Sequence, residues 1–357
     1  MDLERSTLLE RACRQLVRNC SGARMSRLSL GAMLTLCVVS VLCPTLACAD
    51  ERVTLAVAGI DRIIYLPATL AEQLGYFRQE GIEVEFHSLP AGSDGVDELL
   101  AGAAQGVVGF YDHAIDLQAK GMAVMSVVQL GTSPGEVVLV SRKAADRVRS
   151  AADFGGRRLG VTGLGSSTSF LMQYLAASAG VKPGAYSLVP VGGDVTFAEA
   201  LKNNSIEVGM TTEPTASRLL KTGDAKLLVD LRMPEDAIRA FGGLYPAACL
   251  YMEASWIKNH TSQVQKLVNA FVKALHYIQS HSAEEIAAHV PPRFYGGEQE
   301  AYIRVLGNSR SIFTPDGRMP ESGPSTALRV LSTFNKNVQA QRISLEQTYT
   351  SEFLAGR

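Results

Sequence analysis

The sequence predicts an α/β protein with two lobes, each a mostly parallel sheet with helices on both faces. Short apolar strands alternate with helical patterns from residue 53 onward, and such alternation produces parallel sheets covered by helices. The same order of strands and helices then occurs a second time along the chain. The length of 357 residues, with 46% apolar and 19% charged side chains, suits about two globular domains.

The N-terminal segment has the pattern of a cleaved secretory signal. Arg24 and Arg27 precede an apolar run over 28–46, which ends in small residues. Pro44 and several polar residues inside this run, and the lack of a basic flank after it, argue against a membrane anchor. We therefore expect cleavage after Ala49 and a protein exported to the periplasm.

Residues 1–49 are accordingly assigned to an N-terminal extension and a signal peptide. The part before Met25 exceeds the ordinary length of a signal, so Met1 and Met25 both remain candidate starts. Lipid attachment at Cys48 is the alternative to simple cleavage. Cleavage would leave Cys249 as the single cysteine, which excludes an internal disulfide in the mature chain.

The first part of lobe 1 is predicted over 50–141. A strand at 53–57 leads through a turn into a helix at 66–74 with Pro near its start. Apolar residues then alternate with glutamates over 82–86, which is typical of a half-exposed strand. The remaining elements expected here are a helix around 96–100 and strands ending at 110 and spanning 123–130 and 136–141.

Lobe 2 is predicted over 142–242 because the pattern starts again there. The motif L-x-V-x-G at 55–59 returns at 159–163, and the helix after each copy ends at a glycine, Gly75 or Gly180. Both halves thus carry the same βαβαβ order.

The remaining residues, 243–357, have no repeat partner. They contain a strand-like run at 247–251 and a helix whose apolar stripe extends over 264–278. We expect this part to return to lobe 1 and to add C-terminal helices.

Candidate binding residues follow the strands at the edge where open α/β sheets bind ligands. The carboxyl ends of parallel strands meet at one edge, so the residues after 57, 110, 161 and 209 should converge on one cleft. The candidates are Asp61, Tyr65, Asp112, His113, Ser166, Ser167, Thr168 and Glu213.

The segment GLGSST at 163–168 predicts an anion-binding site between a strand and a helix. Gly165 lets the backbone approach a ligand, while free N–H groups at the helix start and the hydroxyls of Ser166, Ser167 and Thr168 could donate to an oxyanion. The alternative is an ordinary helix cap by Ser or Thr. The segment matches neither a Walker loop nor a dinucleotide fingerprint.

Two acidic residues have two open interpretations. Asp112 and Glu213 stand at equivalent places just beyond a strand, and they either accept hydrogen bonds from a ligand or cap the helices that follow. Tyr65 and Tyr111 similarly either flank a ligand or pack in the wall of the cleft.

The sequence carries no recognised catalytic or metal-binding pattern. The six histidines form no metal-ligand motif, and no Gly-x-Ser-x-Gly motif is present. The sequence gives no evidence that Asp112, His113 and Ser166 lie together as a hydrolytic site. Cys249 stands in an apolar run that is typical of a buried, unreactive thiol. We expect no metal and no cofactor. A net charge of −1 without a basic block argues against nucleic acid as a partner.

Four segments resemble one family of transport proteins. They are VTLAVAGIDRIIYLPATLAEQLGYFRQEGIEVEF, GFYDHA, LGVTGLGSSTSFLMQYLAASAGV and VGMTTEPTA. The chain is similar here to the nitrate/alkanesulfonate/taurine group of ABC-transporter solute-binding proteins and to their relatives that bind the pyrimidine precursor of thiamine. The most specific piece extends from Leu66 to Val84.

This resemblance implies a type II periplasmic binding protein fold, in which two doubly wound lobes are joined by a hinge. Such a protein, expected as a monomer, closes on a small-molecule solute and delivers it to a membrane permease without catalysis. The resemblance also places ligand contacts at Asp61, Tyr65, Asp112, 163–168 and near Glu213.

The favoured ligand is a small organic anion such as an alkanesulfonate or taurine. The alternatives are a thiamine pyrimidine precursor or another heterocycle, and an enzyme on the same scaffold. The cysteine-rich motif of the eukaryotic pyrimidine synthases in this group is missing from the sequence, which argues against that enzyme.

Overall fold

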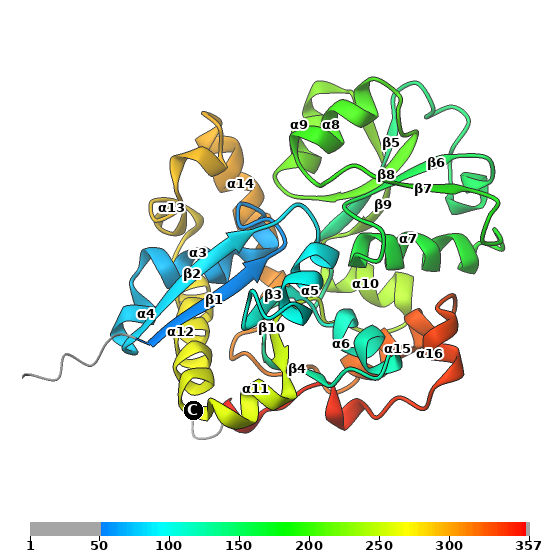
Figure 1. Cartoon of the computed structure of the whole chain (residues 1–357). Helices are drawn as coiled ribbons and strands as arrows, with labels where there is room; N and C mark the ends of the chain where they lie inside the picture. The colour runs from blue at the N-terminus through cyan, green and yellow to red at the C-terminus, as the bar shows by residue number, and fades with distance from the viewer. Residues whose placement is uncertain (1–50, 355–357) are drawn as a thin grey trace, which may run out of the picture. The chain divides into compact units, whose positions relative to one another are not determined.

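The computed structural model describes residues 51–354, which form two five-stranded sheets flanked by helices (Figure 1). The predicted signal peptide, its cleavage site after Ala49, the two candidate starts and Cys48 lie outside the described residues. Within the described range, no helix is both long enough and apolar enough to cross a membrane.

The first sheet combines parallel and antiparallel pairs. Its strands are β1 (Glu51–Val57), β2 (Ile82–Ser88), β3 (Gly106–Phe110), β4 (Val124–Gln129) and β10 (Ala248–Glu253). They lie in the order β2-β1-β3-β10-β4, with β1 parallel to both neighbours and β10 antiparallel to both of its own. The late strand β10 therefore completes the first sheet, as the return of 243–357 to lobe 1 requires.

The second sheet has the same topology. Its strands are β5 (Glu136–Ser141), β6 (Arg158–Val161), β7 (Ser187–Pro190), β8 (Val208–Thr212) and β9 (Ala225–Leu231). The order is β7-β6-β8-β5-β9, with β5 antiparallel to β8 and β9. β6 thus corresponds to β1 and β5 to β10, which confirms the repeat predicted from the sequence.

Helices connect these strands and cover the sheets. In lobe 1 and the C-terminal part they are α3 (Leu66–Gln73), α4 (Tyr76–Gln79), α5 (Gly92–Leu100), α6 (Asp112–Ala119), α11 (Ala254–Asn259), α12 (Thr261–Ser280), α13 (Ala283–Ala287), α14 (Gln299–Ser309), α15 (Gly323–Ser332) and α16 (Lys336–Ala340). In the second lobe they are α7 (Ser167–Ser178), α8 (Val195–Lys202), α9 (Thr215–Thr222) and α10 (Pro234–Phe241). The predicted alternation of strand and helix is confirmed except around the strand β5, which no α-helix separates from β4 or β6.

The chain crosses between the sheets twice, after β4 and after α10. The first crossing precedes β5, so the strand 136–141, which the sequence analysis placed in lobe 1, belongs to the second sheet. The boundary after 141 is wrong in this respect, because an apolar run identifies a strand and not the sheet that it joins. Gly135 lies at this crossing with a positive φ of 66°, and a Cβ there would approach Ile64 Cγ2 to 2.5 Å.

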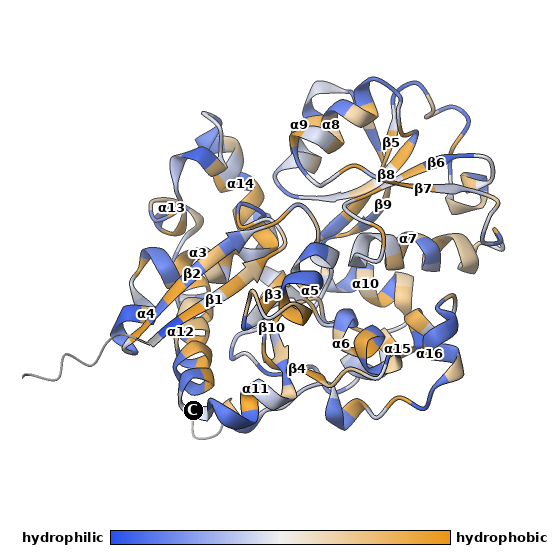
Figure 2. Cartoon of the chain, in the orientation of Figure 1, coloured by the Kyte–Doolittle hydropathy of each residue, from blue (hydrophilic) through white to orange (hydrophobic). Residues whose placement is uncertain are grey.

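Buried apolar side chains hold α12 against the first sheet. The predicted stripe of α12 is confirmed: its residues Leu267, Phe271 and Leu275 are fully buried in a cluster with residues of β1, β3 and α3. Phe271 meets the edge of Phe77 with ring centroids 5.5 Å apart. Figure 2 shows the apolar colour along the strands of both sheets, with blue and orange alternating on the edge strand β2.

A second apolar cluster is shared by the two lobes. Val107 and Tyr251 of the first sheet and Val138 and Leu159 of the second belong to it, together with residues of α6, α7, α10 and α15. The lobes are therefore in buried contact over a continuous surface in this conformation. Cys249 lies buried in β10, and burial raises the pKa of its thiol.

The packing of α12 gives a stability test. We expect Phe271→Ala to lower the free energy of unfolding by about 3–5 kcal/mol, because it removes a fully buried aromatic ring and leaves a cavity. Urea unfolding followed by circular dichroism measures this loss. Leu100→Ala, at a side chain that is 41% exposed, is the matched control and should change stability by about 0.5 kcal/mol or less. Equal losses in the two variants would contradict the assigned core.

Candidate functional site

Residues from both lobes line a small cavity at the carboxyl ends of the parallel strands. Its volume is about 20 Å³, which is near the space that a single water molecule needs. Of the candidate residues named from the sequence, it is lined by Tyr65, His113, Ser166, Ser167 and Thr168. The lobes are thus closed on each other, and a solute larger than this cavity needs them to separate.

Asp112 is fully buried at the start of α6 and connects the two lobes. Its carboxylate accepts hydrogen bonds from the Ser167 hydroxyl of lobe 2 at 2.7 Å and from the Tyr245 hydroxyl at 2.8 Å. Burial raises the pKa of Asp112, while the neighbouring His113 and the two hydroxyl donors oppose this rise. Asp112 does not line the cavity, so its observed partners are protein groups at the lobe interface.

The hydroxyls of 166–168 already have partners within the protein. Ser166 caps α7 by accepting from the Ser169 N–H, and its own hydroxyl donates to the Gly163 carbonyl at 2.6 Å. Thr168 Oγ1 accepts from the Thr162 N–H at 2.9 Å, and Ser167 donates to Asp112. The structure therefore favours the ordinary cap for Ser166. The N–H groups of Ser167 and Thr168 at the start of α7, which have no partner inside the helix, remain as donors for an anion.

Arg62 supplies a positive charge that the sequence analysis did not include in the site. The side chain is 4% exposed, and its guanidinium donates to the carbonyls of Ala58 and Pro90 at 2.6 and 2.8 Å. It also lies 3.6 Å from a carboxylate oxygen of Asp194 in lobe 2, while Nε has no hydrogen-bond partner. A Cβ on Gly193 of lobe 2 would lie 2.3 Å from this guanidinium, so Gly193 allows the lobes to close around it.

Glu136 is the second residue that the sequence analysis missed. It begins the crossing strand β5, lines the cavity and is 3% exposed, yet its Oε2 has no hydrogen-bond partner. Burial raises the pKa of Glu136 well above its ordinary value; the charge of Asp112 adds to this rise and Arg62 opposes it. A single charge at the start of the otherwise apolar run 136–141 was the signal available in the sequence.

Three other predicted residues lie outside the cavity lining. Asp61 is half-buried, and burial together with the nearby charge of Asp194 raises its pKa. Gly165 has a positive φ of 79° with open space where a side chain would stand. Glu213 accepts from the Ser217 N–H at 3.0 Å and pairs with Arg232 at 2.9 Å, as its capping interpretation requires. Ligand contact by these three residues stays a prediction.

Of the two tyrosines considered as ligand contacts, one lines the cavity and the other does not. Tyr65 lines the cavity and packs its ring against Phe110, with centroids 6.4 Å apart. Tyr111 is fully buried, and its hydroxyl is bonded to Thr348 near the C-terminus. Tyr65 is thus placed to flank a ligand, whereas Tyr111 is part of the protein core.

His113 lines the cavity without forming a catalytic relay. Burial lowers the pKa of its imidazole, which favours the neutral form. Its Nε2 is 3.5 Å from the Ser167 oxygen, at the limit of a hydrogen bond, while the Ser167 proton is directed to Asp112. Among residues 51–354, no group of three or more His, Cys, Asp or Glu side chains is arranged to hold a metal ion.

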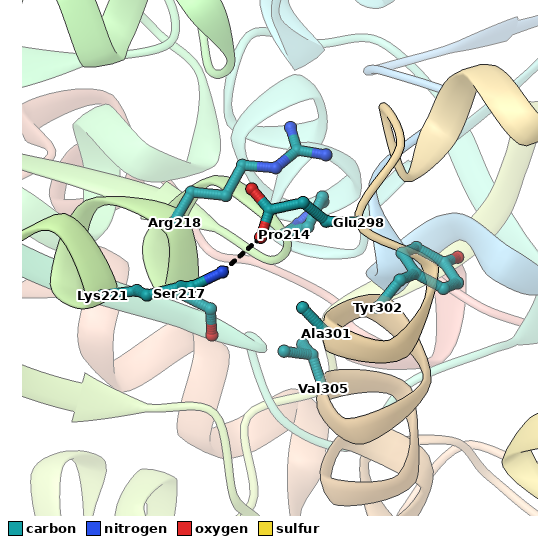
Figure 3. Close-up of a pocket in the computed structure, with 8 residues that line it drawn as sticks. All are labelled: Pro214, Ser217, Arg218, Lys221, Glu298, Ala301, Tyr302 and Val305. Atoms are coloured by element: carbon teal, nitrogen blue, oxygen red, sulfur yellow. Dashed lines mark hydrogen bonds and ion pairs between the residues drawn. The ribbon is translucent and has the colours of Figure 1, made fainter.

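A second contact joins lobe 2 to the C-terminal part of the chain. Figure 3 shows Lys221 of α9 paired with Glu298, the residue before α14, at 2.6 Å beside a cavity of about 40 Å³. Both side chains are substantially exposed, and exposed ion pairs contribute little to stability. This ion pair therefore adds little to the stability of the closed arrangement.

The comparison with protein families identifies the group to which the chain belongs. The model for proteins described as NMT1/THI5 like matches residues 64–285. This chain belongs to the NMT1/THI5-like family.

Solved structures with similar folds include three informative relatives of this NMT1/THI5-like chain. A protein of Bordetella bronchiseptica RB50 is 34% identical, with 85% of this chain and 96% of that chain covered and a TM-score of 0.82. The periplasmic nitrate-binding protein NrtA of Synechocystis PCC 6803 is 14% identical (85% and 87% covered, TM-score 0.67). The alkanesulfonate-binding protein SsuA of Xanthomonas axonopodis pv. citri, bound to MOPS, is 17% identical (85% and 100% covered, TM-score 0.64). These likenesses confirm the type II periplasmic binding protein fold.

One curated relative of this chain is named as an enzyme. The 4-amino-5-hydroxymethyl-2-methylpyrimidine phosphate synthase of Legionella pneumophila is 28% identical over 161 residues, which are 45% of this chain and 49% of that protein. The chain therefore matches about half the length of this curated relative.

The close approach at Gly163 gives a test of the closed conformation. A Cβ on Gly163 would lie 2.7 Å from the Ala91 Cβ of lobe 1, so we expect Gly163→Ala to oppose closure by roughly 1–3 kcal/mol. Small-angle X-ray scattering should then show a larger radius of gyration than for the wild type. Gly155→Ala, where a Cβ would meet no atom within 4 Å, is the control and should leave the radius unchanged. An unchanged radius in both variants would argue against this contact.

The buried carboxyl of Glu136 gives a pH test. Its pKa is higher in the folded protein than the ordinary value of 4.5, so unfolding releases a proton once the pH exceeds that value, and stability falls as the pH rises. We therefore expect Glu136→Gln to gain stability relative to the wild type between pH 4.5 and pH 8. Urea unfolding at several pH values measures this difference, and a difference that does not grow with pH would contradict a raised pKa of Glu136.

Proposed function

We propose that this chain is the solute-binding component of an ABC importer, exported to the periplasm, where it captures a compact organic anion by closing its two lobes. The observation that carries the proposal is the buried cavity lined by both lobes, beside which Ser167 of lobe 2 donates to Asp112 of lobe 1. Such an interface forms only on closure, which couples binding to a change of shape. That change of shape would then be recognised by a membrane permease. We include a monomeric state in the same proposal.

The preference for an anion rests on two sources of positive potential. Helix α7 begins at the cavity, so the N–H groups of its first turn lie there. The buried guanidinium of Arg62 lines the same cavity. An alkanesulfonate or a taurine-like compound has the charge that this position favours. The oxyanion would be bound by backbone N–H groups and Arg62, since the hydroxyls of 166–168 are engaged elsewhere.

A pyrimidine precursor of thiamine, or another heterocycle, is the second candidate ligand. Two observations favour it: the name of the Legionella relative, and the two buried carboxyls of Asp112 and Glu136 near the cavity. Carboxyls accept hydrogen bonds from amino groups of a heterocycle more readily than they tolerate an anion.

Binding accounts for the site better than catalysis does. A serine nucleophile needs a base that takes its proton, but Ser167 donates to a carboxylate that is itself held by Tyr245. His113 is 3.5 Å from that oxygen and makes no closer contact with it. The proposal therefore assigns no catalytic residue and no cofactor.

A thermal-shift screen tests the ligand class. The purified chain, stripped of ligand by unfolding and refolding, is assayed with sulfonates, nitrate, bicarbonate, carboxylates, amino-sulfonates and thiamine pyrimidines. An anion present at about 100 times its dissociation constant should stabilise the protein by roughly 2.7 kcal/mol. Stabilisation by neutral or cationic heterocycles alone would replace the anion by the second candidate, and no stabilisation at all would count against the solute-binding proposal.

The role of Arg62 gives a sharper test. We expect Arg62→Gln to weaken the affinity for an anion found by the screen by roughly tenfold or more, because a buried charged hydrogen-bond donor is lost. Arg52→Gln is the control on the same sheet, since the Arg52 side chain is 63% exposed, and it should leave the affinity unchanged. Isothermal titration calorimetry measures both, and equal affinities in the two variants would remove Arg62 from the site.

A further inference from the structure

Glu136 has an unused acceptor at the base of the cleft. The side chain is almost fully buried, lines the cavity and leaves Oε2 without a hydrogen-bond partner. Buried polar atoms in folded proteins nearly always have partners, and each exception needs an explanation. A ligand group in the cavity would supply the missing partner.

The topology places Glu136 opposite the proposed anion position. β6, which leads into α7, and β5, which begins with Glu136, are separated by β8 alone. Because β5 runs antiparallel to β8, its first residue lies at the same sheet edge as the start of α7. Two strand spacings amount to about 10 Å between backbones. The start of α7, Arg62 and Glu136 line one cavity of about 20 Å³, so a molecule with a few atoms between its two polar ends fits between them only once the lobes separate.

The groups facing Glu136 do not complete its hydrogen bonding. The charged and titratable groups near its carboxyl are Arg62, Asp112, Tyr65 and Tyr245. Tyr245 donates to Asp112, and the guanidinium nitrogens Nη1 and Nη2 of Arg62 donate to backbone carbonyls. The donors at the α7 end suit an oxyanion, whereas Glu136 is a carboxyl without a protein donor.

We propose that Glu136 accepts a hydrogen bond from a nitrogen of the ligand, so that the ligand carries an N–H group a few atoms away from its anionic group. This inference rests on the proposed function and narrows its ligand class to amino-bearing organic anions. A simple alkyl anion would leave Oε2 without a partner, and a buried unsatisfied group is costly.

Binding of such a ligand changes the protonation of the site. Before binding, burial favours the protonated form of the Glu136 carboxyl, since it raises the pKa of this group. An ammonium group entering the cavity favours the carboxylate, so the Glu136 proton leaves to the solvent while the ligand nitrogen keeps its own. At pH values below the raised pKa of Glu136, up to about one proton is therefore released for each amino ligand bound.

Matched pairs of ligands test this inference. Isothermal titration calorimetry on the purified full chain compares taurine with ethanesulfonate, β-alanine with propionate, and 2-aminoethylphosphonate with ethylphosphonate. In the wild type we expect the amino member of a bound pair to bind roughly tenfold or more tightly. In Glu136→Gln this preference should fall to about threefold or less. Repetition in two buffers of different ionisation enthalpy should show proton release for the wild type and none for Glu136→Gln.

Two further variants separate this role from a structural one. Glu136→Asp keeps a carboxyl on a shorter side chain and should retain part of the preference for amino ligands. This variant tests the proposal by the same affinity comparison if Glu136→Gln does not fold. Glu207→Gln removes another carboxyl that is buried in lobe 2, where it pairs with Arg157 at 3.1 Å. It should keep the full preference, and circular dichroism checks the fold of each variant.

The outcomes distinguish the two proposals. Alkyl anions that bind as tightly as their amino partners in the wild type would overturn the inference and leave the proposed function standing. An amino preference that persists in Glu136→Gln would overturn the inference as well. Absence of binding by every member of every pair would contradict the proposed function and this inference together.

Discussion

The buried carboxylate of Asp112 is the interaction on which the closed cleft depends. It belongs to lobe 1, yet its two donors are Ser167 at the start of α7 in lobe 2 and Tyr245 in the second crossing. A buried carboxylate without donors is strongly unfavourable, so the closed arrangement is what provides Asp112 with its partners. The same hydrogen bond fixes the N-terminal end of α7 against the loop after β3.

The two crossing strands explain why the cleft lies where it does. β5 and β10 are each inserted antiparallel into a sheet that is otherwise parallel in its centre. Each of these strands therefore begins at the sheet edge where the parallel strands end. The first residue of β5, Glu136, thus lies at the edge where a ligand would bind. A protein of this topology can open and close by small changes in the crossing segments, because the strands themselves stay within their sheets.

The chemistry of the cleft follows from which groups the protein has left without partners. The hydroxyls of 166–168 satisfy one another, the backbone or Asp112, and so they shape the loop. The groups without a hydrogen-bond partner at the cavity are Nε of Arg62 and Oε2 of Glu136, beside the N–H groups of Ser167 and Thr168 at the start of α7. Donors at one end and a carboxyl at the other favour a solute with an anionic group and a nitrogen.

Sequence periodicity and turn residues by themselves determined the strands, the helices and their repeated order in the two lobes. They also determined the edge of the sheets at which Tyr65 and 166–168 converge, because the position after a strand is local information. They did not show that 136–141 joins the second sheet, that Glu136 and Arg62 enter the cleft, or that Glu213 pairs with Arg232. These features depend on which segments pack together across long separations in the chain, and only the tertiary structure decides which buried polar groups find partners and which remain for a ligand.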